Sequence, residues 1–472
     1  MRKISARLGA AAMITVLMGM VLAAIAAPAQ TFKTLVSFNG TNGADPLAPV
    51  VQGTNGNFYG TTEMGGLPSQ GTVFEVTSRG ALKTLFTFDA NDTAGGNPFA
   101  ALILATDGNF YGAAEYGGPY GCGTVFKITA LGALTVVHNL VSSTDGCGPT
   151  GALIQATDGN FYGTTTAGGG TSNAGTLFKI TPSGTLTTLH SFDVTDGIEP
   201  FAGLIQGNDG NLYGITAGGG ASTSCSNGCG TIFKIVSGGA LTTLHSFDST
   251  DGAYPYGGLV QASDGSFYGT TEYGGTENYG TIFKITSGGV LTTLHSFDSA
   301  DGAYPFAALI QATDGNLYSS TTEGGSSSAC TFGCGTIFKI TPGGMLTTLH
   351  NFDSTDGATP NALLQATDGN FYGTTVGGGA SLAGTIFSLS VGLGPFVKTV
   401  PAAGRDGKRV TILGTNLTGT TKVTFNGTPV PFSVISSTEI STAVPTGATT
   451  GPVQVVTPSG TLTSSVNFQV LP

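Results

Sequence analysis

The feature that most constrains this chain is a short aromatic motif that recurs seven times at nearly constant spacing. The copies read NGNFYG once, DGNFYG three times, and DGNLYG, DGSFYG and DGNLYS once each. Their tyrosines lie 50 to 55 residues apart, at Tyr59, Tyr111, Tyr162, Tyr213, Tyr268, Tyr318 and Tyr372. A fixed period of this length predicts a repeat architecture in which each copy is one supersecondary unit.

One repeat reads as four short strands joined by turns. In residues 248–297, apolar or β-branched runs at 258–262, 267–271, 281–286 and 291–297 alternate with Gly-rich or Asp-rich turns. We name these runs strands a, b, c and d in chain order. Asp264-Gly265 favours the positive φ of a two-residue hairpin between strands a and b. Four antiparallel strands per repeat of this length are typical of a propeller blade.

The count of strands predicts how the repeats end. Strand c occurs seven times, beginning at Thr72, Thr124, Thr176, Thr231, Thr281, Thr336 and Thr385. Strand d follows only the first six copies, and its seventh copy is the N-terminal segment 32–38, FKTLVSF. We therefore expect an all-β fold, a seven-bladed β-propeller closed by the N-terminal strand. Closure would bury both apolar faces of every blade and remove exposed sheet edges.

The order of strands within a blade follows from the distance between blades. The connection must cross about three strand spacings, roughly 14 Å. The loop 248–255 can span that distance, whereas the turn 287–289 is too short, so strand a is expected innermost and strand d outermost. The b–c loop is also long enough, which leaves open a phase in which each blade begins at strand c.

The first residues are typical of an export signal. Arg2, Lys3 and Arg7 precede an apolar run at 8–26, and the small residues 27–29 offer a cleavage site before Gln30. We predict a signal peptide at 1–29 and a secreted or cell-surface protein; a retained membrane anchor is the alternative. The formal net charge of −11 becomes −14 when three basic residues leave with the signal. Such acidity opposes binding to nucleic acid or anionic membranes.

The repeat resembles a known family. The blocks ATDGNFYGTT, GTIFKIT and LTTLHSFD, within residues 32–390, resemble the GloVer-type tandem repeat of exported bacterial proteins, also called choice-of-anchor repeats. This resemblance implies no particular chemistry. After residue 390 the pattern changes, and VTILGTNL, VTFNGTPV, TEISTAVP and GPVQVVTPSG resemble an IPT/TIG domain, which is an immunoglobulin-like β-sandwich. That second resemblance implies a spacer or interaction module.

Together these patterns predict four segments and an extracellular partner. The segments are the signal peptide at 1–29, the propeller at 31–390, a linker at 391–394 and the sandwich at 395–472. With no membrane span expected after the signal is removed and no nucleic-acid partner, we expect an extracellular glycan or protein ligand.

The six cysteines are expected to form disulfides, because an even count in an exported protein favours them. Cys122 and Cys147 lie in a b–c loop and the following d–a loop, which emerge on the same face of a four-stranded meander. Cys225-x₃-Cys229 and Cys330-x₃-Cys334 each lie within one b–c loop. A Cys₄ zinc site built from these two pairs is the alternative.

Several polar residues recur at equivalent positions, which favours structural roles over catalysis. Five histidines share one position of strand d: His138, His190, His245, His295 and His350. Five lysines share one position of strand c, where we expect ion pairs with turn aspartates: Lys127, Lys179, Lys234, Lys284 and Lys339. Paired aspartates recur in d–a loops: Asp89 and Asp92, Asp193 and Asp196, Asp248 and Asp251, Asp298 and Asp301, Asp353 and Asp356. These loops are compatible with Ca²⁺, but their sparse ligand spacing favours solvated turns.

The b–c and d–a loops vary most, and they carry aromatic residues. A rigid scaffold with varied aromatic loops on one face is typical of a binding surface. The candidate ligand-binding residues are Tyr116, Tyr120, Tyr254, Tyr256, Tyr273, Tyr279, Phe306 and Phe332. We predict non-catalytic binding or scaffolding outside the cytoplasm. The alternatives are a polysaccharide-acting lyase or hydrolase at the propeller mouth, which needs a unique polar cluster there, and a purely structural surface protein.

Overall fold

A computed structural model describes residues 30–67, 69–89, 93–236 and 239–472. Every regular element in these residues is a β-strand, so the all-β prediction is confirmed. The described part of the chain holds no helix that is long and apolar enough to cross a membrane. The predicted signal peptide, 1–29, lies outside the described residues.

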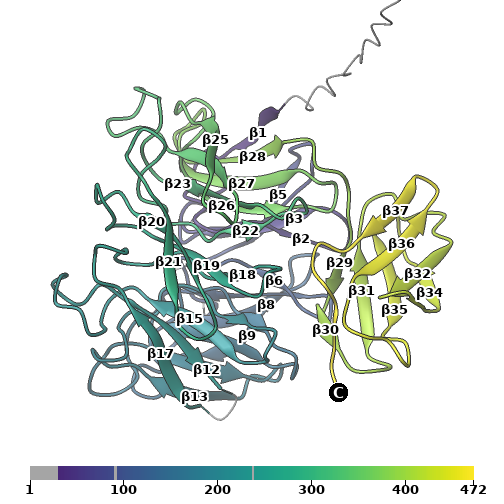
Figure 1. Cartoon of the computed structure of the whole chain (residues 1–472), viewed down its shortest axis with the longest axis horizontal. Coiled ribbons are helices and arrows are strands. Elements are labelled where there is room, and N and C mark those ends of the chain that lie inside the picture. Colours follow the sequence, from purple (N-terminus) through teal and green to yellow (C-terminus); the bar gives the residue numbers. More distant parts are fainter. Residues whose placement is uncertain (1–29, 68, 90–92, 237–238) are drawn as a thin grey trace, which may run out of the picture.

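The strands of the repeat region form seven antiparallel sheets of four strands each (Figure 1). Six of them follow the predicted order a, b, c, d. Sheets 1 to 3 comprise β2 (Val51–Gln52), β3 (Phe58–Thr62), β4 (Thr72–Val76) and β5 (Leu82–Thr87); β6 (Ile103–Leu104), β7 (Phe110–Ala114), β8 (Thr124–Ile128) and β9 (Leu134–Asn139); and β10 (Ile154–Gln155), β11 (Phe161–Thr165), β12 (Thr176–Ile180) and β13 (Leu186–Ser191). Sheets 4 to 6 comprise β14 (Ile205–Gln206), β15 (Leu212–Thr216), β16 (Thr231–Ile235) and β17 (Leu241–Ser246); β18 (Val260–Gln261), β19 (Phe267–Thr271), β20 (Thr281–Ile285) and β21 (Leu291–Ser296); and β22 (Ile310–Gln311), β23 (Leu317–Thr321), β24 (Thr336–Ile340) and β25 (Leu346–Asn351).

Sheet 7 joins the two ends of the repeat region. It contains β26 (Ala358–Gln365), β27 (Phe371–Gly377), β28 (Thr385–Ser390) and, as its outer strand, the N-terminal β1 (Thr31–Ser37). β1 pairs antiparallel with β28 from Thr31 opposite Ser390 to Ser37 opposite Thr385. The pairing expected from the strand count is therefore present. It also sets the phase, because strand c pairs with both strand b and strand d of the same sheet in all seven cases.

The residues of the recurring motif make structural contacts within their own sheet. In sheet 5, the Tyr268 hydroxyl donates to Asp264 at 2.8 Å, and the Lys284 ammonium lies 2.8 Å from the same carboxylate. Tyr268 and Lys284 are direct partners across strands b and c. Gly269 is required because a Cβ there would lie 2.5 Å from the Phe283 ring. The motif thus ties the a–b turn to strand c and makes room for a core phenylalanine.

Neighbouring sheets pack through the same aromatic pair. The motif tyrosine of one sheet lies against the phenylalanine that precedes the motif tyrosine of the next, with ring centroids 4.1 Å apart for Tyr59–Phe110 and 4.2 Å for Tyr213–Phe267. The last sheet makes this contact with the first, since Tyr372 lies 4.0 Å from Phe58. Every strand b is buried along its whole first five residues, so both faces of each sheet are covered.

Strand a is shorter than the sequence predicts. The expected strand 258–262 is reduced to Val260–Gln261, and only β26 is long. In the segment that leads into strand a, backbone carbonyls accept hydrogen bonds from the neighbouring sheet instead of from strand b of their own sheet. The Thr270 hydroxyl of sheet 5, for example, donates to the Ala307 carbonyl before β22 at 3.1 Å. Local periodicity cannot show such a bond between sheets.

The C-terminal strands form a sandwich with its own core. One sheet has the order β29 (Lys398–Val400), β31 (Arg409–Leu413), β35 (Glu439–Ala443) and β34 (Phe432–Val434), and the other β33 (Thr428–Pro429), β32 (Lys422–Phe425), β36 (Val453–Thr457) and β37 (Gly460–Thr463). A short parallel ladder joins β30 (Ala403–Gly404) to β38 (Gln469–Val470). Val410, Val423, Ile440 and Val455 are fully buried between the sheets.

The sandwich lies against one side of the seven sheets (Figure 1). We call this side, which carries the a–b turns, the turn face. The Thr438 hydroxyl donates to the Thr54 carbonyl of sheet 1 at 2.7 Å, and Gln469 donates to the Asn208 carbonyl of sheet 4 at 2.8 Å. The opposite side, which carries the b–c and d–a loops, is the loop face.

Candidate functional site

The loop face is built by bridges between the two variable loops of each sheet. A d–a loop and the following b–c loop are paired at Gly96–Tyr116, Cys147–Ala167, Ala253–Tyr273 and Ala303–Glu323. These pairings confirm that both loop types emerge on one face. The loops therefore share a single surface on the side away from the sandwich.

An aromatic cluster fills the centre of this face. The Tyr256 and Phe306 rings are stacked at 5.2 Å, and Phe201 meets both edge-on. Phe99 contacts Phe201 at 5.0 Å although they precede strands of sheets 2 and 4. Side chains from sheets that are not neighbours can meet only where the sheets converge. We call these four half-buried residues the axial cluster.

Glutamates lie at the end of strand b in four of the sheets, and the charge of one of them, Glu272, acts on Tyr256 of the axial cluster. Glu63, Glu115 and Glu272 directly follow this strand in sheets 1, 2 and 5, and Glu323 lies one residue further along in sheet 6. The amide of each glutamate, or of the neighbouring Thr322 in sheet 6, donates to the carbonyl of the residue that precedes the d–a proline; the Glu272 amide, for example, donates to the Tyr254 carbonyl at 3.1 Å. Tyr254 adopts a φ of 53°, in the left-handed region, and its six equivalents do the same.

The electrostatics of these carboxylates differ from those of surface acids. Burial, reinforced by the charge of Glu323, raises the pKa of Glu272 to about 7. Burial, and then the charges of Glu115 and Asp45, also raise the pKa of Glu63. Burial and the nearby charges of Glu272 and Glu199 raise the pKa of Tyr256 to about 12. The centre of the loop face is thus acidic and partly desolvated, and its carboxylates differ from sheet to sheet.

The predicted aromatic residues separate into three groups. Tyr116, Tyr120 and Phe332 are the most exposed, at 54%, 62% and 71% of their full surface. Tyr254, Tyr273 and Tyr279 form a second group around Tyr304, which contacts Tyr273 at 5.0 Å and Tyr279 at 5.8 Å. Tyr256 and Phe306 belong to the axial cluster. The structure therefore brings five of the eight together near the centre and leaves three on outlying loops.

Sequence reasoning missed Tyr304, Phe99, Phe201 and the glutamates. A signal was present, because the residues before and after the d–a proline occupy equivalent positions in every repeat. The residue before it is Asp45, Asn97, Gly148, Glu199, Tyr254, Tyr304 or Thr359. Comparing the repeats position by position would have found this variable site.

The recurring histidines and aspartates make structural pairs. The Nε2 atoms of His190, His245, His295 and His350 lie 2.7 to 2.8 Å from Asp196, Asp251, Asp301 and Asp356, and His138 lies 3.0 Å from Asp145. The first aspartate of each loop accepts backbone N–H groups, as Asp248 does from Thr250. Among the described residues, no group of three His, Cys, Asp or Glu side chains is placed to hold a metal. Asp92 lies outside the described residues.

Three of the five strand-c lysines make the predicted ion pairs, and no ion pair of Lys127 or Lys339 is found among the described residues. Lys179, Lys234 and Lys284 lie 2.8 to 3.1 Å from Asp158, Asp209 and Asp264. Burial opposes ionisation of Asp158, yet hydrogen bonds from Lys179 and Asn160 lower its pKa to about 2. Sheet 1 inverts the pair, since Glu75 accepts from Asn55 and Asn57 instead.

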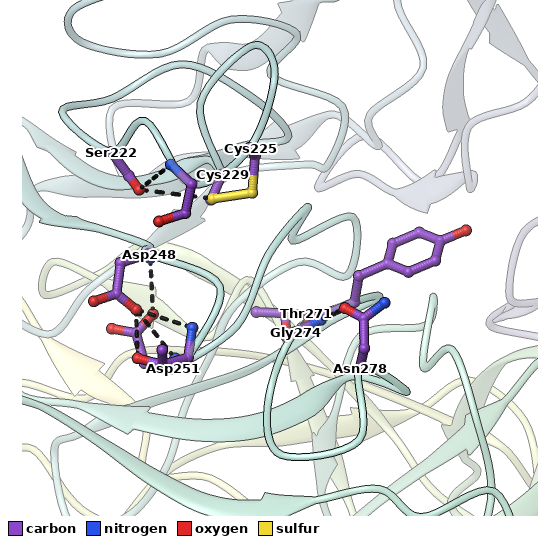
Figure 2. The surroundings of a disulfide bond; sticks show 11 residues. Ser222, Cys225, Cys229, Asp248, Asp251, Thr271, Gly274 and Asn278 are labelled. Atoms are coloured by element: carbon purple, nitrogen blue, oxygen red, sulfur yellow. Dashed lines mark hydrogen bonds between the residues drawn. A yellow bond between two sulfur atoms is a disulfide. The ribbon is translucent and has the colours of Figure 1, made fainter.

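The three disulfides hold the variable loops. Cys122–Cys147 joins the b–c loop of sheet 2 to the next d–a loop, with Cα atoms 4.4 Å apart. Cys225–Cys229 and Cys330–Cys334 each close a short loop. Figure 2 shows the first of these short loops beside Ser222 and near the Asp248–Asp251 turn. The zinc alternative is therefore wrong, because these cysteines are bonded to each other.

Comparisons with known structures support the architecture. Similar folds include a virginiamycin B lyase from Staphylococcus aureus (12% identity, 77% of this chain and 99% of that one, TM-score 0.52). The extracellular domain of a hybrid two-component system from B. thetaiotaomicron follows at 12% identity (88% of this chain, 50% of that one, TM-score 0.50). PorZ, a surface component of the type-IX secretion system of Porphyromonas gingivalis, has 14% identity (93% and 61%, TM-score 0.50). At these identities the likeness shows the fold alone, that of propeller-like proteins.

The sequence comparisons identify the family. No curated protein matches the chain. Residues 395–470 match the IPT/TIG domain, and the Gloeobacter/Verrucomicrobia repeat matches residues 21–225 and 169–332, more than half of the chain. Both resemblances drawn from the sequence are confirmed, and the chain belongs to the Gloeobacter/Verrucomicrobia repeat family.

Proposed function

We propose that this chain is an extracellular, non-catalytic binding protein. In this proposal residues 31–390 form a closed seven-bladed β-propeller, 391–394 a linker and 395–472 the IPT/TIG domain, and residues 1–29 direct export. The contact of Tyr372 with Phe58, which repeats the contact between other neighbouring sheets, supports closure. Three disulfides support an oxidising compartment.

The ligand site in this proposal is the loop face. The sandwich occupies the turn face, while the loop face carries tyrosines with large exposed areas beside partly desolvated carboxylates. Aromatic faces stack on sugars or apolar side chains, and carboxylates accept hydrogen bonds from hydroxyl or ammonium groups. This combination suits a glycan or a protein segment. The single observation that carries the proposal is the gathering of Tyr254, Tyr273 and Tyr304 beside Glu272 and Glu323.

A glycan array and a protein array, probed with residues 30–472, test the proposal. We expect a ligand whose binding falls about ten-fold in Tyr273→Ala and Tyr116→Ala, because aromatic anchors dominate such interfaces. Val290→Ala and Met345→Ala are the matched controls, since these side chains are 67% and 71% exposed in c–d turns on the turn face. Binding that is equal in all four variants, or no ligand on either array, would overturn the proposal.

A polysaccharide-acting lyase or hydrolase is the second candidate. The observation that favours it is Glu272, whose pKa of about 7 suits a group that gives or takes a proton at neutral pH. The carboxylates also occupy the mouth unevenly, which an enzyme requires. Turnover of a polysaccharide that is lost in Glu272→Gln, with binding retained, would establish this candidate.

A further inference from the structure

The basic residues of this acidic chain are unevenly placed. Three of the 13 that remain after residue 29 fall within five positions, at Arg405, Lys408 and Arg409. All three are exposed, at the start of the sandwich. In the described parts of the chain, their side chains make no ion pair. Three of the five strand-c lysines, by contrast, are paired with turn aspartates.

These three cations line a cleft between the sandwich and the turn face. The cleft has a volume of about 650 Å³, within the range of small-molecule sites. Its other wall is formed by the a–b turns of sheets 2 and 3, including Thr106 and Thr157. Both hydroxyls are free of hydrogen bonds to the described residues, and Leu471 adds an apolar surface.

The walls of the cleft are fixed on both sides. On one side the Lys398 ammonium donates to the Gln365 carbonyl of sheet 7, and the Thr438 hydroxyl donates to Thr54 of sheet 1. On the other side Gln469 donates to Asn208 of sheet 4. The sandwich is therefore held by hydrogen bonds to sheets 7, 1 and 4, on either side of the cleft over sheets 2 and 3. A ligand would enter a preformed site and lose little binding energy to reorganisation.

The charge inside the cleft is positive. Among the lining side chains the one carboxylate is Asp158, which already pairs with Lys179 at 2.8 Å and accepts from the Tyr162 hydroxyl at 2.9 Å. Pro472 also lines the cleft, and its terminal carboxylate adds one negative charge against the three cations. Asp107 and Glu439 lie with Arg409 in a smaller adjoining pocket, and neither forms an ion pair with it. The three cations are thus available to a ligand.

We propose that this cleft is an anion-binding site for a carboxylate-bearing saccharide. Arg405 and Arg409 can each bind a carboxylate through two parallel N–H donors, Lys408 adds a third charge, and Thr106 and Thr157 offer hydroxyls to the sugar ring. A cleft of about 650 Å³ has room for part of a saccharide chain. Nucleic acid and anionic bilayers are disfavoured because the surrounding surface belongs to a chain of net charge −14 after residue 29. The site does not depend on the loop-face proposal, since it lies on the opposite side.

Polygalacturonate is the probe, with neutral dextran as its uncharged counterpart. Titration calorimetry on residues 30–472 should show binding of polygalacturonate but not of dextran, weakening as salt is raised. Replacing Arg405, Lys408 and Arg409 together by Gln should weaken binding at least about ten-fold. The matched control replaces Arg79, Lys83 and Lys422, which are exposed elsewhere, by Gln, and so removes the same charge.

Three outcomes would overturn this proposal. They are equal binding by the cleft and control variants, equal binding of dextran and polygalacturonate, and binding only to DNA or to phosphatidylserine vesicles in parallel arms. Loss of binding in Tyr273→Ala, on the loop face, would also count against the cleft. Unchanged unfolding midpoints in both triple variants exclude misfolding as the cause, since all six side chains are exposed.

Discussion

Truncating Phe38 measures how firmly the N-terminal strand closes the repeat region. Phe38 follows β1, is fully buried, and packs 5.4 Å from Phe74 of sheet 1. Its amide donates to the carbonyl of Gly384, which directly precedes β28 in sheet 7, at 2.9 Å. Phe38→Ala removes a fully buried aromatic side chain and leaves a cavity, which should lower the free energy of unfolding by about 3–5 kcal/mol.

The control is the same substitution at an equivalent position inside the repeat. Phe247 is fully buried and packs 5.3 Å from Phe283, so Phe247→Ala removes the same contact between sheets 4 and 5. Urea unfolding can be followed by far-ultraviolet circular dichroism or tyrosine fluorescence, because the chain has no tryptophan. A loss below about 1 kcal/mol for Phe38→Ala, with the full 3–5 kcal/mol loss for Phe247→Ala, would refute closure by β1.

Two further predictions concern the loop face. Replacing Cys122 and Cys147 together by Ser should lower the free energy of unfolding by about 3 kcal/mol, since the disulfide closes a loop of 25 residues; losing the disulfide with a four-residue separation, Cys225–Cys229, should cost about 2 kcal/mol by the same relation. Glu272→Gln should stabilise the protein at pH 8 by about 1–2 kcal/mol, after allowance for partial exposure, and change nothing at pH 4.

The sign of the Glu272 effect follows from its raised pKa. The folded protein holds the proton more tightly than the unfolded chain, so the wild type loses stability as pH rises from about 4.5 towards about 7. Thermal melts of both proteins from pH 4 to 8 check this dependence. A variant whose melting temperature tracks the wild type across that range would show that Glu272 is not desolvated. For the disulfides, equal losses at both positions would contradict the dependence on loop length.

Much of the fold could be predicted from the sequence, because the residues of each repeat specify its own turns and strands. The Asp-Gly dipeptide fixed the a–b hairpin, and the alternation in 281–286 fixed strand c, since both depend on neighbours in the chain. The ion pair of Lys284 with Asp264 was also predictable, because hairpin geometry brings these residues together. The length of strand a was not, because its flanking carbonyls bond to the adjacent sheet.

Only some residues of the candidate site could be predicted from the sequence. Tyr254 and Tyr273 were identified because aromatic residues in variable loops indicate binding, and the bridge between their loops follows from strand order. The sequence does not indicate Glu272 as a site residue, because nothing near it in the chain shows that it is desolvated. Part of the rise in its pKa comes from the charge of Glu323, which a different repeat supplies.

Spacing and alternation along the chain were enough to predict seven sets of four strands, the need for the N-terminal strand to complete the last set, and a C-terminal sandwich. These follow from spacing and alternation, which act between residues close in the chain or in matching positions of the repeat. Tertiary structure alone decided that Phe99, Phe201 and Phe306 meet, and that the sandwich leaves a basic cleft over sheets 2 and 3. These contacts depend on the angles between sheets and on which surface the sandwich covers. Neither can be predicted from the spacing of residues.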